Sequence, residues 1–203
     1  MLKICGLTRL SDLGVCQELG IDLTGFIFHP GSSRYVSPDL VAAWPKQSEL
    51  RVGVWVEEDA EKILEITEMA DLDLVQLHGN QDPEFCRSLD PGRVIKTFWP
   101  ERFEQKQDFE QELARYKGAC RFFLFDAGRS LGGHGRGIAC PWLREVRSPG
   151  PFLLAGGLGP ENLDQALDLR PAGVDLNSGV EIAPGRKDPE KISQAVKQVR
   201  GLE

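Results

Sequence analysis

The sequence predicts an α/β fold, a single (β/α)8 barrel with a parallel eight-stranded core, and two observations support it. Short apolar and β-branched runs alternate with amphipathic helical stretches along the chain, which is typical of parallel sheets with right-handed crossovers. Eight such units fit into 203 residues, at the lower end of the length this barrel needs. A doubly wound open sheet is the alternative, but it would rarely use so many units in so short a chain.

The first half of the chain contains four predicted strand–helix units. The opening run is short and apolar and ends before a glycine, as expected for a buried strand, and the four strands are placed at Leu2–Cys5, Leu23–Phe28, Arg51–Val56 and Leu74–Leu77. Recognisable caps and a proline in a first turn mark several helix starts. The first helix is expected from about Leu10 to Leu19, with Thr8 or Ser11 as its cap, and the second starts at Ser37-Pro38-Asp39. The third covers Glu58–Met69, with Ile63, Leu64 and Ile66 at core spacing, and the fourth runs from Asp82 to Leu89.

The second half repeats this alternation. Its strands are expected at Arg93–Phe98, Arg121–Phe125, Phe152–Ala155 and Val174–Leu176, and its helices over Phe103–Tyr116, over Pro160–Leu169 and from about Pro189 to Val199. The loop from Ala127 to Ala139 is long and glycine-rich, which suits a lid over a ligand, although simple flexibility explains it as well. No break in composition divides the chain, so we expect one domain over residues 1–203.

The composition excludes several classes of protein. A formal net charge of −7 argues against a nucleic-acid-binding surface, which needs a basic stripe. No apolar run approaches the length of a membrane span, and the first strand begins too early to leave room for a signal peptide. The five cysteines are an odd number with no CxxC pair, so we expect free thiols rather than disulfides or a zinc site. The expected location is therefore the cytoplasm.

Polar residues and glycines follow the predicted strands, and in a barrel the carboxyl ends of the strands gather on the rim where such enzymes do their chemistry. This convergence of residues far apart in sequence is stronger evidence than any single motif. The residues concerned are Cys5, Arg34, His78, Asp126, Gly156, Gly157, Ser178 and Gly179.

Two glycine-containing loops are candidate phosphate sites. Gly156-Gly157 and Ser178-Gly179 follow the seventh and eighth predicted strands, where barrels often bind phosphate with backbone N–H groups and a helix N-terminus. Glycine lets the backbone approach an anion closely. Tight turns from strand to helix would explain either pair alone, but both pairs at these two strands favour phosphate.

The remaining candidates each have a plain structural explanation beside the functional one. Cys5 is more simply a small core residue, although a thiolate base or nucleophile is the alternative. Asp126 follows the apolar run at 122–125, where a carboxylate is costly to bury unless it caps a helix or takes part in the chemistry. If apolar surroundings raise its pKa, it could serve as a general acid. Arg34 suits a carboxylate or phosphate, but a solvated surface arginine is equally plausible. His78 could donate to a substrate, although closing a turn is the favoured interpretation.

A set of motifs spread in order over the whole chain resembles phosphoribosylanthranilate isomerase. The opening Lys3-Ile4-Cys5-Gly6-Leu7-Thr8 and the late Ser178-Gly179-Val180-Glu181 are the most specific of them. The others are Gly25–Phe28 with Ser33–Val36, Val75–Gly79, Leu124–Asp126, Ala155–Leu158 with Pro160–Asn162, Gly173–Asp175, and Pro184-Gly185 with Lys187-Asp188.

This resemblance implies a (β/α)8 barrel and an Amadori rearrangement in tryptophan biosynthesis, in which N-(5-phosphoribosyl)anthranilate becomes 1-(2-carboxyphenylamino)-1-deoxyribulose 5-phosphate. It implies that Cys5 is the general base and Asp126 the general acid. It also implies that Arg34 holds the anthranilate carboxylate, while Gly156-Gly157 and Ser178-Gly179 hold the phosphate. The iminium intermediate is itself the electron sink, so no metal or cofactor is expected.

The sequence departs from the family pattern in two places. The loop after the sixth strand reads Gly132-Gly133-His134-Gly135-Arg136 and continues to Trp142 in a slightly longer form, which affects the expected lid contacts. Asn177 stands where a serine is common beside Ser178; its side chain can still donate to a phosphate oxygen, so we expect it to bind substrate.

Other functions remain open at this stage. One alternative is another phosphosugar isomerase or epimerase on the same barrel. An epimerase, however, would want metal-ligating His and Asp side chains on several strands, and the histidines are His29, His78 and His134. A second alternative is a non-catalytic phosphate-binding barrel. The expected partner is a small phosphosugar–anthranilate substrate, without nucleic acid or membrane, and both a monomer and a homodimer remain open.

Overall fold

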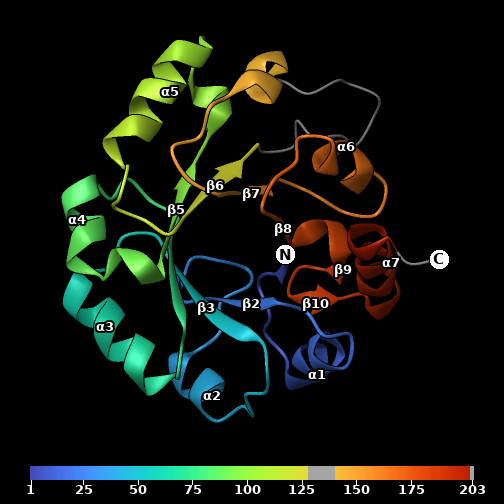
Figure 1. Cartoon of the computed structure of the whole chain (residues 1–203). Coiled ribbons are helices and arrows are strands. Elements are labelled where there is room, and N and C mark those ends of the chain that lie inside the picture. The colour runs from blue at the N-terminus through green and yellow to red at the C-terminus, as the bar shows by residue number, and fades with distance from the viewer. Residues whose placement is uncertain (128–139, 202–203) are drawn as a thin grey trace.

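The computed structural model describes residues 1–127 and 140–201, and their strands form a closed parallel barrel (Figure 1). The strands pair in sequence order, and β8 returns to β1 with Lys3 opposite Asp175. This confirms the predicted fold class. The strands are β1 (Leu2–Ile4), β2 (Leu23–Ile27), β3 (Leu50–Trp55), β4 (Leu74–Leu77), β5 (Val94–Phe98), β6 (Phe122–Asp126), β7 (Phe152–Ala155) and β8 (Gly173–Leu176).

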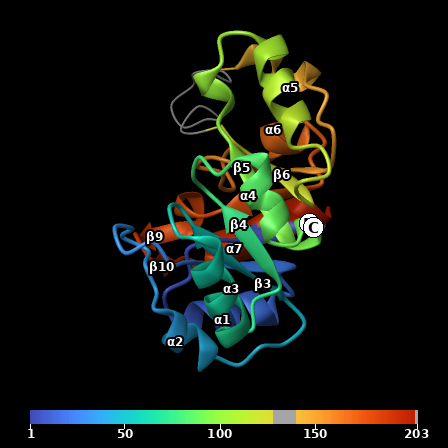
Figure 2. The same ribbon diagram turned by 90° about the vertical axis from the view of Figure 1, so that its left-hand side faces the viewer.

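The helices lie around the outside of the strands, as Figures 1 and 2 show from two directions. None of those in the described part of the chain is long and apolar enough to cross a membrane. The α-helices are α1 (Leu10–Glu18), α2 (Pro38–Ala42), α3 (Ala60–Met69), α4 (Pro83–Ser88), α5 (Lys106–Arg115), α6 (Leu163–Leu167) and α7 (Pro189–Arg200).

Side-chain caps explain where several of these helices begin. Ser37, Asp59 and Asp82 each accept a hydrogen bond from a backbone N–H three residues later, and Asp188 does so at α7. The cap expected for α1 is wrong. Its N-cap residue is Arg9, whose side chain makes no capping hydrogen bond, while Thr8 donates its hydroxyl to the Gly185 carbonyl at 2.6 Å.

The expectation that Leu64 of α3 faces the core is also wrong, because its side chain is exposed while Ile63 and Ile66 are buried.

Shorter elements accompany the eight strands of the barrel. An antiparallel hairpin that the sequence did not predict, β9 (Glu181–Ala183) with β10 (Arg186–Lys187), follows β8. Four 3-10 helices are also present in the described ranges: η1 (Pro91–Arg93), η2 (Pro100–Arg102), η4 (Pro141–Glu145) and η5 (Ser178–Val180). Most of the glycine-rich loop, including His134, lies outside the described residues.

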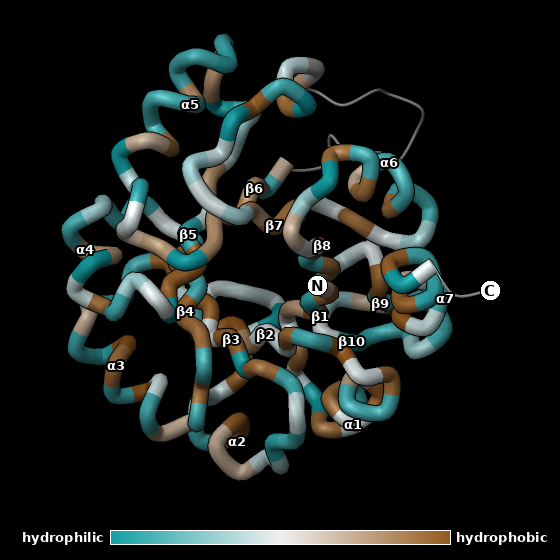
Figure 3. The backbone as a smooth tube through the Cα atoms, in the orientation of Figure 1, coloured by the Kyte–Doolittle hydropathy of each residue, from teal (hydrophilic) through white to brown (hydrophobic). Residues whose placement is uncertain are grey.

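The core has two parts, one inside the barrel and one between the strands and the helices. Along β6, for example, Phe122 and Leu124 belong to the inner cluster, while Phe123 and Phe125 belong to the larger outer cluster. Figure 3 shows many hydrophobic residues along the strands and more hydrophilic residues along the surrounding helices. Because strand side chains alternate between two faces, the residue two positions past an inner-facing one also points inward. This alternation brings the polar residues at the strand ends into the mouth of the barrel.

Candidate active site

A cavity of about 400 Å³ lies at the carboxyl ends of the strands. The predicted site residues line it, with the exception of Arg34 and Gly179. Those brought together are Cys5, His78, Asp126, Gly156, Gly157, Asn177 and Ser178. The walls between them are mainly apolar and include Ile27, Val54 and Leu124, so the cavity offers a few polar groups on an apolar surface, as small-molecule sites usually do.

Cys5 lies directly after β1, and its side chain is buried at the cavity. Gly25 of β2 leaves space for it, because a Cβ there would come within 2.8 Å of the Cys5 sulfur and 3.1 Å of Lys3 Nζ. Burial raises the pKa of the Cys5 thiol above 9.0, and Asp175 adds to this, whereas Lys3 and Lys187 act in the opposite direction. The thiol therefore carries its proton at neutral pH.

Asp126 and His78 meet on another side of the cavity. Asp126 ends β6, and its Oδ2 lies 3.7 Å from Nε2 of His78, too far for a hydrogen bond. Burial lowers the pKa of His78 to about 4, so its imidazole is neutral near pH 7. Trp99 holds the ring edge-on at 5.3 Å between centroids.

The favoured interpretation of His78 as the residue that closes a turn is wrong. Gln81 closes that turn by accepting a hydrogen bond from the Gly79 N–H at 3.1 Å. The His78 ring lines the cavity instead, and in the described part of the chain its buried Nδ1 has no hydrogen-bond partner.

Arg34 lies at the edge of the cavity, where the carboxylate of Glu181 binds its guanidinium group. Its Nε and Nη2 donate to Glu181 at 2.9 and 2.6 Å, and its side chain is only 21% exposed. The alternative of a solvated surface arginine is therefore wrong. Gly6, which has a φ of 69°, is needed here because a Cβ at this position would lie 2.8 Å from Arg34 Cδ and 2.7 Å from Asn177 Oδ1.

Glu181 binds a second cation from the hairpin. Its Oε1 accepts from Lys187 Nζ at 2.9 Å and from the Gly185 N–H at 3.1 Å. Burial works to raise the pKa of Glu181, but the hydrogen bonds and charges of Arg34 and Lys187 outweigh burial and lower that pKa below its ordinary value. The β9–β10 hairpin thus supplies the anion that orients Arg34.

The two candidate phosphate loops pack against each other. Gly156 and Gly157 have φ values of 111° and 64°, a region that other residues rarely adopt. A Cβ on Gly179 would lie 2.0 Å from the Leu158 carbonyl oxygen, so the backbones of the two loops touch. Asn162 braces the first loop by donating to the Gly157 carbonyl at 3.1 Å. Tight turns and an anion site are therefore compatible explanations of the same glycines.

Asn177 and Ser178 belong to the second of these loops. Asn177 Oδ1 accepts a hydrogen bond from Lys187 Nζ at 2.9 Å, so this oxygen is engaged within the protein. Both residues line the cavity.

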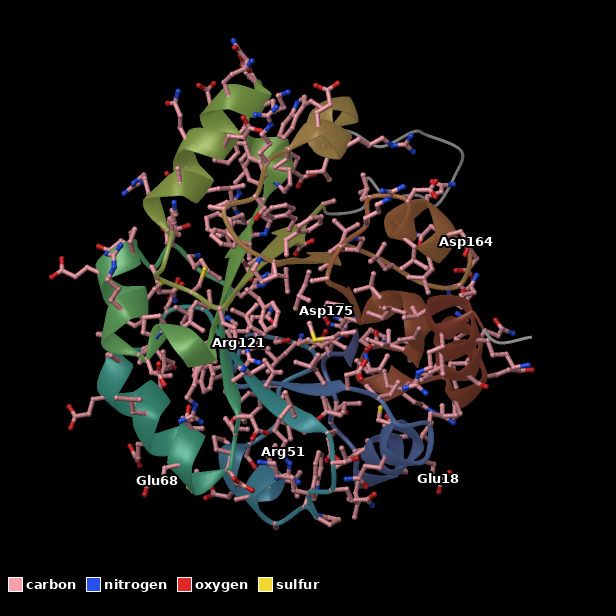
Figure 4. All side chains as sticks on the ribbon, in the orientation of Figure 1. Glu18, Arg51, Glu68, Arg121, Asp164 and Asp175 are labelled. Carbon is pink, nitrogen blue, oxygen red and sulfur yellow. The ribbon has the colours of Figure 1, made fainter. Side chains whose placement is uncertain are left out.

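Three polar residues at or under this cavity were missed by the sequence analysis as functional groups: Lys3, Gln76 and Asp175. Lys3 and Asp175 form a buried ion pair of 2.7 Å, and Asp175 and Gln76 line the cavity. Figure 4 shows Asp175 near the centre of the ring of strands. The signal was available, because Asp175 stands between Val174 and Leu176 just as Asp126 follows an apolar run.

Together these groups give the cavity two kinds of proton-transfer chemistry. A thiol enters from β1 and a carboxyl group from β6, and these strands lie three positions apart around the ring, so they approach a ligand from different sides. Within residues 1–127 and 140–201, no group of three or more His, Cys, Asp and Glu side chains is placed to hold a metal ion.

Comparison with known proteins gives matches over nearly the whole chain. A family model described as N-(5'phosphoribosyl)anthranilate (PRA) isomerase matches residues 2–198. The N-(5'-phosphoribosyl)anthranilate isomerase of Desulfovibrio desulfuricans is 46% identical over 97% of this chain and 93% of its own.

Solved structures agree with this match. Monomers generated from the dimeric phosphoribosylanthranilate isomerase of Thermotoga maritima have a TM-score of 0.82 at 36% identity, with 99% of this chain and 98% of that one covered. A phosphoribosyl anthranilate isomerase in complex with reduced 1-(o-carboxyphenylamino)-1-deoxyribulose 5-phosphate has a TM-score of 0.80, with the same identity and coverage.

Proposed function

Because the chain belongs to the N-(5'-phosphoribosyl)anthranilate isomerase family, the aldose–ketose isomerases of tryptophan biosynthesis, we propose that Asp126 and Cys5 are its general acid and general base. The substrate would be N-(5-phosphoribosyl)anthranilate and the product 1-(2-carboxyphenylamino)-1-deoxyribulose 5-phosphate. The single observation that carries this assignment is the cavity that Cys5, Asp126 and the two glycine loops share.

The first step is opening of the ribose ring. The protonated Asp126 carboxyl group gives its proton to the ring oxygen, the C1–O bond breaks, and the aniline nitrogen forms an iminium at C1. His78 supports this role because its neutral imidazole offers the Asp126 carboxylate no compensating positive charge.

The second step is removal of the proton on C2. Cys5 takes this proton as a thiolate, the iminium accepts the electron pair, and an enolamine forms. Tautomerisation of the enolamine to the ketone adds a proton at C1 and removes the proton of the C2 hydroxyl group. The proton that Cys5 took from C2 balances the one that Asp126 gave to the ring oxygen, so the overall composition does not change. The raised pKa of Cys5 suits this order of events, because the positive charge of the iminium favours the thiolate only after the ring has opened.

The ends of the substrate are held by groups that do not react. The guanidinium of Arg34 would bind the carboxylate of the anthranilate ring, with Glu181 fixing its orientation. The phosphate would accept hydrogen bonds from the backbone N–H groups of Gly156, Gly157, Ser178 and Gly179 and from the Asn177 amide. These loops leave room for an anion because their glycines carry no side chains.

A fluorescence assay that follows loss of freshly made phosphoribosylanthranilate tests the proposal. We expect turnover by the wild type and at least a 1000-fold loss in Cys5→Ala and in Asp126→Asn, about the effect of removing one essential proton-transfer group. Binding of the reduced product analogue, measured by calorimetry, should persist in both variants. Near-wild-type rates in either variant would overturn that assignment of roles.

A further inference from the structure

Two buried charges lie beneath the reactive end of β1. Lys3 is fully buried, Asp175 is 6% exposed, and the two residues stand opposite each other in the β1–β8 register. Their ion pair measures 2.7 Å from Nζ to Oδ2. Burying such a pair rarely increases stability over apolar side chains of similar size, so stability alone does not explain its place beside the cavity.

Lys3 also contacts Cys5. The two residues are two positions apart on β1 and point to the same side of the strand, and both the Cys5 sulfur and Lys3 Nζ lie against the space above Gly25. The positive charge of Lys3 attracts the Cys5 thiolate as well as the Asp175 carboxylate. Lys3 therefore interacts with both groups.

The other charged groups that face Cys5 have their own counter-ion. They are Lys187 on β10 and Arg34 after β2, and both are bound to Glu181. Asp175 differs from these groups, because its Oδ1 is buried, has no hydrogen-bond partner in the described ranges, and belongs to a residue that lines the cavity. An oxygen in this state is suited to accept a hydrogen bond from a ligand hydroxyl group.

We propose that Lys3 is the positioning residue for Cys5, holding the sulfur and stabilising its thiolate, and that Asp175 is the counter-charge that suppresses the thiolate until a polyhydroxylated sugar phosphate fills the cavity. A ligand hydroxyl group that donates to Asp175 Oδ1 disperses the carboxylate charge and so strengthens the effect of Lys3 on the sulfur. This inference rests on the proposed function only in taking Cys5 as the base.

The charges act on the thiol in opposite directions. Burial raises the pKa of Cys5, Lys3 and Lys187 lower it, and Asp175 raises it. Burial works to lower the pKa of Lys3 itself, but Asp175 and Cys5 outweigh burial and raise that pKa above 10.5. Lys3 therefore keeps its charge throughout the neutral range.

The test is the pH dependence of alkylation of Cys5 by iodoacetamide, read from the peptide that carries Cys5 by mass spectrometry. This readout separates Cys5 from the other four cysteines and needs no substrate. We expect Asp175→Asn to move the midpoint of alkylation about one pH unit lower, the usual effect of a single nearby charge. Lys3→Met should move it higher by a similar amount, and Lys3→Arg should leave it close to that of the wild type.

Matched controls separate this effect from damage to the fold. Lys3→Met leaves Asp175 buried without a partner, so the double variant Lys3→Met, Asp175→Asn removes both charges together and should fold, as judged by circular dichroism. Its midpoint should lie between those of the two single variants. Adding the reduced product analogue to the wild type should lower the pH midpoint of Cys5 alkylation, measured on the fraction of Cys5 that still reacts with iodoacetamide. This shift should be absent in Asp175→Asn.

An unchanged or higher midpoint in Asp175→Asn would overturn the inference. Such a result with turnover still dependent on Cys5 would leave the proposed function standing. The expected shifts together with turnover that survives Cys5→Ala would instead overturn the role of Cys5 as the base.

Discussion

Replacing Glu181 with glutamine removes the anion that holds Arg34 at the edge of the cavity. The carboxylate binds Arg34 on one side and Lys187 on the other, and its own side chain is 5% exposed while that of Lys187 is 1% exposed. Glutamine has nearly the same shape, so it removes the charge without creating a cavity. The variant therefore isolates the electrostatic part of the interaction.

The size of the effect follows from what glutamine leaves unpaired. Its carbonyl oxygen can accept from one of the two cations, but its amide group presents N–H donors to the other. One buried cation therefore loses its hydrogen bond to residue 181, and both lose their counter-ion. Breaking a buried pair in this way costs about 3 to 5 kcal/mol. Because Arg34 is partly exposed and can recover some hydration, we expect about 3 kcal/mol, the lower end of that range.

Two measurements check this prediction. Urea unfolding gives the loss of unfolding free energy, and steady-state kinetics should show a higher KM with a smaller change in kcat, because Arg34 binds the substrate and does not react with it. Glu18→Gln is the matched control, since Glu18 is exposed on the outside of the barrel (Figure 4). A loss below 1 kcal/mol with an unchanged KM would refute the reasoning.

The pH dependence of the same variant gives a separate check. The folded-state pKa of Glu181 lies below its ordinary value of 4.5. Its contribution to stability is therefore fully present above 4.5 and is lost as the pH falls through the folded-state pKa. The difference between wild type and Glu181→Gln should accordingly be constant from pH 7 to pH 5 and shrink at more acid pH. A difference that grows on acidification would contradict this account.

Two further predictions concern the rim of the cavity. The pKa of His78 falls from 6.5 to about 4 on folding, so the unfolded chain binds more protons in this window and the wild type loses stability as the pH falls from 6.5 to 4. The variant His78→Gln should lose less stability over this range, and equal acid sensitivity of the two proteins in urea unfolding would count against a neutral imidazole in the folded protein. Gly157→Ala places a Cβ at a φ of 64°, which should cost about 1 to 2 kcal/mol of unfolding free energy and weaken binding of inorganic phosphate; retention of both would exclude a strained phosphate loop.

The site residues that could be predicted from the sequence are those that directly follow a recognisable strand. Cys5, His78 and Asp126 each come at the end of a strand, two positions after an inner-facing residue, and the period of two along a strand carries them into the cavity. The glycines after β7 and β8 were found for the same reason, since they directly follow recognisable strands. Leu64 was misplaced because helical spacing alone does not say which side of a helix meets the barrel.

What the sequence could not give is the pairing of residues far apart in the chain. Arg34 and Glu181 are separated by 147 positions, and Lys3 and Asp175 by 172. A single sequence offers no pattern that links such positions. The β9–β10 hairpin that carries Glu181 is also too short for a clear alternation of apolar and polar residues, so the group that orients Arg34 was not predictable.

These long-range pairs concentrate where the barrel closes. The Cys5 N–H donates to the Leu176 carbonyl at 2.8 Å, the Lys187 N–H donates to Asp12 at 3.1 Å, and Thr8 reaches Gly185. Cys5 and Arg34 thus obtain their surroundings only when β8 and the hairpin dock on β1. Asp126, by contrast, lies on β6 between two strands that are neighbours in sequence. Local opening of the β1–β8 seam would therefore dismantle the thiol environment first and leave the carboxyl group in place.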